Sequence, residues 1–193
     1  MCGKQLWKWT ADAALDSGVF THVVCSSDGG FDTDYYRDAF IDNDRIPALA
    51  TDAAPLDPLL GIYAERYFAD IVCLLQPTSP LRDANDIRNA YYCLCLNDFD
   101  SVVSVTSVGD KYWTYRDGKP KAFYDPMNRL NRQDERTNVL FYENGAIYFT
   151  KSRYIFDGCR IGGKVGLYEM PQNKGHQVDS EYDWKVCEAI LGC

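Results

Sequence analysis

The sequence predicts one α/β domain in which a mostly parallel sheet carries helices on both faces. The chain has 193 residues, 46% of them hydrophobic, which is enough for one well-buried core but crowded for two. Up to about Thr106, strand-like apolar runs alternate with helical patterns, as in α/β folds. The run over residues 70–75 (DIVCLL) is continuously apolar, which is typical of a central parallel strand.

Each element has a local signal. A helix over residues 6–17 has apolar residues near helical spacing and ends at Gly18. A helix over 57–68 has Pro58 in its first turn, with Asp57 as the expected cap. Further helices are expected over residues 34–40, 83–96 and 184–191, with Asp183 a candidate cap for the last. Strands are expected over residues 21–26, 70–75, 101–106, 145–150 and 165–170.

After Thr106 the alternation loosens, and residues 111–138 are polar and aromatic without a clear period. The whole chain, residues 1–193, is therefore predicted to be a single domain with an irregular insertion. Residues 111–136 hold seven basic and four acidic side chains, so this stretch has a charge of +3 and the remainder −11. The stretch is either a solvated loop of mixed charge or a binding site for an anionic ligand.

Composition excludes several classes of protein. The net charge of −8 disfavours nucleic acid and anionic membranes as partners, because both require a basic surface. Aromatic residues make up 14% of the chain, which excludes a disordered acidic chain. No apolar run approaches the ~20 residues that a membrane-spanning helix needs.

The eight cysteines are predicted to be reduced thiols in a cytoplasmic protein. The first residues contain no apolar run of signal-peptide length. Cys25 and Cys73 lie in apolar strand-like runs, where cysteine usually acts as a small buried hydrophobe. Cys93 and Cys95 are two residues apart, with no Cys-x-x-Cys pair or nearby His to complete a zinc site.

Two polar clusters follow predicted strands, where ligands bind in open α/β sheets. One is Ser26-Ser27-Asp28. The other is residues 76–82 (QPTSPLR), in which two prolines fix the backbone while Gln76, Thr78, Ser79 and Arg82 offer hydrogen-bonding groups. This composition favours a binding role, with capping of the following helix by Thr78 or Ser79 as the alternative.

Two more clusters lie in the second half of the chain. Arg132 could bind a carboxylate or phosphate with two hydrogen bonds. Asn144 and Gly145 form either a ligand-facing turn or an ordinary Asn-Gly turn. Asp179 and Asp183 could bind Mg²⁺, or they could form a helix cap and its charged first turn; the spacing favours capping for Asp183 and leaves Asp179 as the freer metal ligand.

Taken in order, these pieces resemble the acylneuraminate cytidylyltransferase family. The specific strings are LLQPTSPLR (residues 74–82) and ENGAIY (143–148), and weaker matches lie at residues 3–6, 26–28, 49–57, 100–105, 132–133 and 179–184. The resemblance covers nearly the whole chain. It implies a three-layer, Rossmann-like nucleotide-sugar transferase fold and a homodimer formed through the insertion, at about residues 112–142.

The resemblance also implies a reaction in which CTP and a nine-carbon acidic sugar (a nonulosonic acid such as sialic acid) give the CMP-sugar and pyrophosphate, with Mg²⁺. Ser27 and Asp28 are expected near the nucleotide, and Arg82 and Asp179 in catalysis, with Asp179 as the metal ligand. The residues expected to bind the sugar are Gln76, Thr78, Ser79, Arg132, Gln133, Tyr142 and Asn144.

Two departures from the family pattern bear on activity. The sequence starts just after the place where family members carry a glycine-rich, basic loop that cradles the triphosphate. Gln177 stands where many relatives carry an Asp, which removes one formal charge from the expected metal site. The alternatives are therefore a catalytically inactive relative, which binds nucleotide or sugar or pairs with a complete subunit, and an enzyme that uses an eight-carbon acidic sugar.

Overall fold

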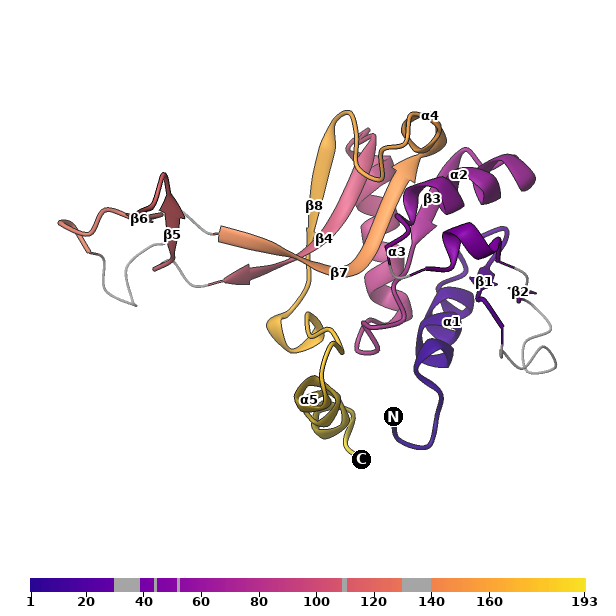
Figure 1. Ribbon diagram of the computed structural model, residues 1–193, viewed down its shortest axis with the longest axis horizontal. Helices are drawn as coiled ribbons and strands as arrows, with labels where there is room; N and C mark the ends of the chain where they lie inside the picture. The colour runs from indigo at the N-terminus through magenta and orange to yellow at the C-terminus, as the bar shows by residue number, and fades with distance from the viewer. Residues whose placement is uncertain (30–38, 44, 52, 109–110, 130–139) are drawn as a thin grey trace.

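The main sheet has four strands in the order β3-β7-β4-β8 (Figure 1). The computed structural model describes residues 1–193 except 30–38, 44, 52, 109–110 and 130–139. The four strands are β3 (Ile71–Leu74), β4 (Ser101–Val108), β7 (Leu140–Lys151) and β8 (Val165–Glu169). β7 is antiparallel to both β3 and β4, whereas β4 and β8 are parallel. Three strands therefore point the same way, and β7 runs against them between β3 and β4.

Helices cover both faces of this sheet, which confirms the predicted fold class. On one face, α1 (Leu6–Ser17) and α3 (Ala84–Leu96) enclose a core that includes Ile87, Val102 and Phe149. On the other face lie α2 (Asp57–Arg66) and α4 (Ser152–Phe156), and Val72 and Leu74 of β3 pack there against Ile155 and its neighbours. Successive residues of a strand thus serve opposite layers, because side chains alternate across a sheet.

Helix caps differ from the expectations at three helices: at α3, at α2, and at α5 (Glu181–Leu191), where the N-cap is Ser180 and not Asp183, which lies in the first turn. Asp83 is the N-cap of α3 and shares a reciprocal capping box with Asp86, so the alternative that Thr78 or Ser79 caps this helix is wrong. Asp57 is the first residue of α2 rather than its cap, and its carboxylate pairs with the guanidinium of Arg160 at 3.2 Å. This pairing joins α2 to the loop that precedes β8.

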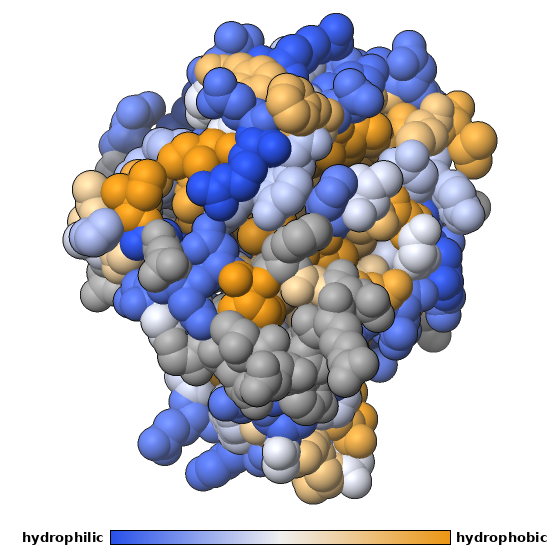
Figure 2. Space-filling view, turned by 90° about the vertical axis from the view of Figure 1, so that its right-hand side faces the viewer, coloured by the Kyte–Doolittle hydropathy of each residue, from blue (hydrophilic) through white to orange (hydrophobic). Residues whose placement is uncertain are grey.

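A second, two-stranded parallel sheet pairs β1 (Val24–Ser26) with β2 (Phe40–Asp42). The helix predicted over residues 34–40 lies mostly outside the described residues, and its last residue, Phe40, begins β2 instead. The 3-10 turn η1 (Pro47–Leu49) follows. On the side of the molecule that carries α2 and β2, hydrophobic atoms form separate groups within a largely hydrophilic surface (Figure 2).

The expected insertion contains a hairpin that projects from the body as an arm (Figure 1). Its strands β5 (Trp113–Arg116) and β6 (Lys119–Ala122) pair antiparallel. Trp113 is 54% and Tyr115 79% exposed. Sequence periodicity missed this hairpin because short strands that bury neither face carry no alternation of apolar and polar residues.

The chain ends with η2 (Gln172–Lys174) and α5 (Glu181–Leu191). Cys2 and Cys193 are joined as a disulfide, with their Cα atoms 5.7 Å apart, so the expectation that every cysteine is reduced is wrong for this pair. The tertiary structure brings the two together by packing Met1 and Leu81 against Cys187 of α5. The other six cysteines are free thiols. Among the described residues no helix has the length and apolar character needed to cross a membrane.

Candidate active site

The candidate site lies where the loop after β3 meets the segment before α5. The main-chain N–H of Val178 donates to the carbonyl of Thr78 at 2.8 Å, and Gln177 Nε2 donates to Gln76 Oε1 at 3.3 Å. Lys174 fixes the same segment to the start of α3, because its ammonium contacts the carboxylates of Asp83 (2.6 Å) and Asp86 (2.8 Å). Two stretches that are about 100 residues apart in sequence thus form one surface.

Arg82 ends the loop after β3 and stabilises it from the buried side. The side chain is only 2% exposed. Its Nη1 donates to the carbonyls of Ala146 (2.6 Å) and Gln76 (3.3 Å), and its Nη2 donates to Thr10 Oγ1 (2.6 Å). Burial lowers the pKa of the guanidinium to about 10, which still leaves it charged at neutral pH. These contacts are those of a positioning residue, and the predicted catalytic role of Arg82 stays a prediction.

Ser79 and Thr78 occupy different parts of the loop. Ser79 is 1% exposed, and its Oγ has no hydrogen-bond partner among the described residues. Thr78 is half-buried and uses its carbonyl to hold Val178. The loop therefore presents Gln76 and Thr78 near the surface and encloses Ser79, whose predicted contact with the sugar remains untested.

Asn144 lies inside β7, so the predicted Asn-Gly turn is wrong. It stands where the β4–β7 register shifts between Val103 and Val105. Its Oδ1 accepts from Ser104 Oγ (2.6 Å) and the N–H of Ala146 (3.2 Å), and its Nδ2 donates to Thr106 Oγ1 (3.0 Å). The 1% exposed side chain thus replaces ladder hydrogen bonds at a bulge, and its predicted sugar contact remains untested.

At Gly145 the backbone lies closer to neighbouring side chains than at any other glycine of the site. It has φ +68°, and an added Cβ would lie 1.5 Å from Gln177 Nε2 and 2.6 Å from Gln76 Oε1. A similar approach occurs at Gly175, where an added Cβ would lie 2.2 Å from Thr106 Oγ1. Only glycine lets the segment before α5 lie against β4 and β7 in this way.

Tyr142 borders the same surface. The side chain is 43% exposed, and its hydroxyl donates to the carbonyl of Gly175 at 3.4 Å. Tyr142 is therefore accessible to a ligand beside Gly175, in the segment that also carries Gln177. Arg132 and Gln133, the other predicted contacts for the sugar carboxylate, lie outside the described residues.

Asp179 is exposed and precedes the N-cap of α5, which is Ser180. Asp183 reciprocates the cap, because its Oδ2 accepts from Ser180 Oγ (2.6 Å) and from the N–H of Asp179 (3.3 Å). The Ser180 hydroxyl lowers the pKa of Asp183. Asp183 is thereby committed to the helix start, whereas the carboxylate of Asp179 has no partner among the described residues. These residues contain no cluster of three His, Cys, Asp or Glu side chains that could hold a metal ion.

Ser27 and Asp28 follow β1, as expected. The Ser27 hydroxyl lies 2.9 Å from the carbonyl and 3.2 Å from the N–H of Gly29, so it closes the local turn. Asp28 is exposed. Sequence reasoning missed two neighbours of this turn: Arg45 Nε donates to Ser26 Oγ at 3.2 Å, and the hydroxyl of Tyr63, which donates to the carboxylate of Asp42, accepts from Ser26 Oγ at 2.7 Å. No local sequence pattern indicated either residue. Both lie in later segments of the chain, which only the tertiary structure places beside Ser26.

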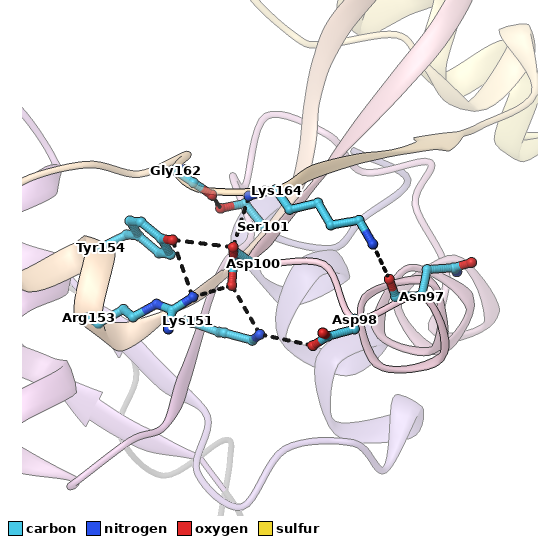
Figure 3. Close-up of polar contacts among 9 residues, drawn as sticks. All are labelled: Asn97, Asp98, Asp100, Ser101, Lys151, Arg153, Tyr154, Gly162 and Lys164. Carbon is cyan, nitrogen blue, oxygen red and sulfur yellow. Dashed lines mark hydrogen bonds and ion pairs between the residues drawn. The ribbon is translucent and has the colours of Figure 1, made fainter.

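An ion cluster around Asp100 lies at the opposite end of β4 (Figure 3). The carboxylate accepts from the N–H of Lys164 (2.9 Å), the ammonium of Lys151 (3.1 Å) and the guanidinium of Arg153. The Lys164 N–H and then Lys151 hold the pKa of Asp100 below its usual value. The cluster fastens β7 and the loop before β8 to the start of β4, and it is remote from Gln76.

The chain matches no family model, but it is similar to curated proteins over almost its full length. It is 29% identical to N-acylneuraminate cytidylyltransferase A of Danio rerio over 97% of this chain and 45% of the relative. It is 27% identical to the N-acylneuraminate cytidylyltransferase of an Escherichia coli strain, over 97% of this chain and 46% of that protein. The chain thus spans about half the length of these relatives.

Solved structures show the same fold at low identity. CMP:2-keto-3-deoxy-manno-octonic acid synthetase complexed with CTP matches with a TM-score of 0.65 and 13% identity, over 98% of this chain and 88% of that one. A 4-diphosphocytidyl-2C-methyl-D-erythritol synthase matches with a TM-score of 0.65 and 10% identity, over 97% and 90% of the two chains. The chain is therefore similar to the N-acylneuraminate cytidylyltransferases over nearly all of its sequence and has the α/β fold of the cytidylyltransferases.

Proposed function

We propose that this chain transfers CMP from CTP to an acidic nine-carbon sugar and releases pyrophosphate. The observation that carries the proposal is the contact of Gln76 with Gln177 over Gly145, with the exposed Tyr142 against Gly175 of the same segment, in a chain whose curated relatives are N-acylneuraminate cytidylyltransferases. The surface lies beyond the carboxyl end of β3, where α/β sheets bind ligands, and beside the second half of β4.

In this reaction the anomeric hydroxyl of the sugar attacks the α-phosphorus of CTP. A P–O bond to the sugar forms, the bond to the β-phosphate bridging oxygen breaks, and the hydroxyl proton is lost to solvent or a base. Such a transfer depends mainly on positioning and charge neutralisation. Gln76 and Tyr142 are the described groups able to position the sugar.

We propose Mg²⁺ as the cofactor, with Asp179 as its ligand. Mg²⁺ is commonly held by one or two carboxylates together with substrate phosphates, so a single free carboxylate beside the sugar surface fits this ion. When bound, the ion would neutralise charge on the phosphates. Asp179 is available for this role because Asp183 takes the place at the helix start.

A homodimer formed through the arm is part of the same proposal. Exposed Trp113 and Tyr115 on the hairpin offer apolar area that a second copy would bury, and Arg116, Lys119 and Lys121 on the same hairpin supply positive charge. Aromatic and arginine residues are enriched at such interfaces. We also propose a cytoplasmic setting, because six of the eight cysteines are free thiols, which favour a reducing compartment, although the Cys2–Cys193 disulfide does not.

The test is incubation of the purified chain with CTP labelled at the α-phosphate, Mg²⁺ and sialic acid, followed by separation of nucleotide sugars. We expect labelled CMP-sugar, and a large loss of it in Asp179→Asn. As a matched control, Asp157→Asn changes an exposed carboxylate in the turn after α4 and should leave the yield unchanged. If no product forms while sugar or CTP still binds, the chain is a catalytically inactive relative. Parallel reactions with an eight-carbon acidic sugar decide the sugar class.

A further inference from the structure

Gln76 is held at two points in the candidate site. Its main-chain carbonyl accepts hydrogen bonds from Arg82 Nη1 (3.3 Å) and Thr10 Oγ1 (3.5 Å). Its side-chain oxygen Oε1 accepts from Gln177 Nε2 (3.3 Å). The two hydrogen bonds to the main-chain carbonyl fix the position of Gln76. The hydrogen bond from Gln177 fixes which end of the Gln76 amide points toward the segment before α5.

Gln177 is itself restrained. Its amide lies against Gly145, so closely that a Cβ there would be 1.5 Å from Nε2. The next residue, Val178, is hydrogen-bonded to Thr78, and Lys174 ties the segment to the start of α3. The donor that reaches Gln76 is therefore set in place by the fold.

The direction of this contact has a chemical consequence. A glutamine side chain has one accepting end and one donating end. Because Oε1 accepts from Gln177, the contact fixes the orientation of the amide, and Nε2 is its end with no hydrogen-bond partner among the described residues and is free to donate to a ligand. A carboxylate at position 177 would have the opposite effect, since it would accept from Nε2 and leave Oε1 to face the ligand.

We propose that Gln177 is a positioning residue that orients the Gln76 amide, so that Nε2 donates to the carboxylate of the sugar and favours an anionic acceptor. This assignment rests on the proposed function. In this proposal the preference for an acidic sugar depends on Gln177, whose uncharged amide orients Gln76 and does not need to contact the sugar.

The structural part is tested without any ligand, by NMR of the side-chain amides in the complete chain. The Gln76 resonances are assigned by their loss in Gln76→Met. In Gln177→Met, which keeps the length of the side chain but removes the donor, we expect the Gln76 amide to shift toward the values of exposed glutamines. Unchanged Gln76 resonances would overturn the proposal.

The functional part is tested by the affinity for sialic acid and for its neutral carboxamide. In Gln177→Met we expect binding of the acid to weaken by about 3- to 10-fold, the range for one hydrogen bond, while binding of the carboxamide changes less. A merely structural role would weaken both alike. The matched control is Gln172→Met, an exposed glutamine that donates to the carbonyl of Ser107 and should change neither affinity.

A double-mutant cycle decides whether Gln177 acts through Gln76. We expect the variant with both Gln76→Met and Gln177→Met to bind the acid no more weakly than Gln76→Met alone, because the orienting effect has lost its target. Additive losses would refute the mechanism. If the unaltered chain binds no acidic sugar, the proposed function fails, and the NMR result still decides whether Gln177 orients Gln76.

Discussion

Replacing Gly145 by Ala gives the most direct test of how the candidate site is packed. At φ +68° a left-handed backbone costs a non-glycine residue about 1–2 kcal/mol. The added Cβ also overlaps Gln177 Nε2 and Gln76 Oε1, so this pair must separate, which costs about 1 kcal/mol for the lost hydrogen bond. The free energy of unfolding should fall by about 2–3 kcal/mol, measured from urea midpoints at a constant m-value.

The matched control is Gly158→Ala, because Gly158 has φ +77° and nothing within 4 Å of an added Cβ. It should show the backbone cost alone, about 1–2 kcal/mol. In a Gln177→Ala background the hydrogen bond is already lost and the nearest side chain is removed, so Gly145→Ala should there cost only the backbone term of about 1–2 kcal/mol. Equal costs at the two glycines, or an undiminished cost of Gly145→Ala in the Gln177→Ala background, would show that the Gln76–Gln177 pair does not pack on Gly145.

Three further results are expected. Arg82→Met should lower the free energy of unfolding by about 3 kcal/mol or more, because one buried and two partly buried acceptors lose a charged donor; a loss below 1 kcal/mol in urea would contradict the contacts described. Asp100→Asn should destabilise the chain at pH 7, with a difference from the unaltered chain that shrinks below about pH 4. The folded-state pKa of Asp100 is depressed, so its stabilisation is present above the unfolded pKa and is lost as the carboxylate becomes protonated; a difference that does not vary with pH would refute the ion cluster. Tyr115→Ser should shift the mass in light scattering from dimer to monomer, and a dimer that persists would remove the arm from the interface.

Much of the fold could be predicted because the signals are local. The predicted helix over residues 6–17 is α1, and the apolar run at 70–75 contains β3. Gly18 adopts a left-handed conformation at the end of α1. These features follow from periodicity and from the preferences of single residues, which act over a few positions in the chain. The arm and β2 could not be predicted, because strands of three or four residues are too short to show an alternation of apolar and polar residues, and those of the arm are mostly exposed.

The sequence could predict which residues form the candidate site, but not how these residues are arranged in space. The Gln76–Arg82 loop was singled out by its stiff backbone and polar groups, and the structure places it at the site. The burial of Arg82 under that loop depends on the carbonyl of Ala146, which belongs to a strand 64 residues away. The contact between Gln177 and Gln76 spans 101 residues, so no local pattern could indicate it.

The sequence by itself determined the α/β class, the order of most helices and strands, and the polar loop that follows β3, because each depends on interactions between near neighbours. The tertiary structure alone decided the antiparallel course of β7, the enclosure of Arg82 and Asn144, and the seating of Gln177 against Gly145. These features require segments distant in sequence to pack at van der Waals distance, where one Cβ or one unpaired donor changes which arrangement is stable.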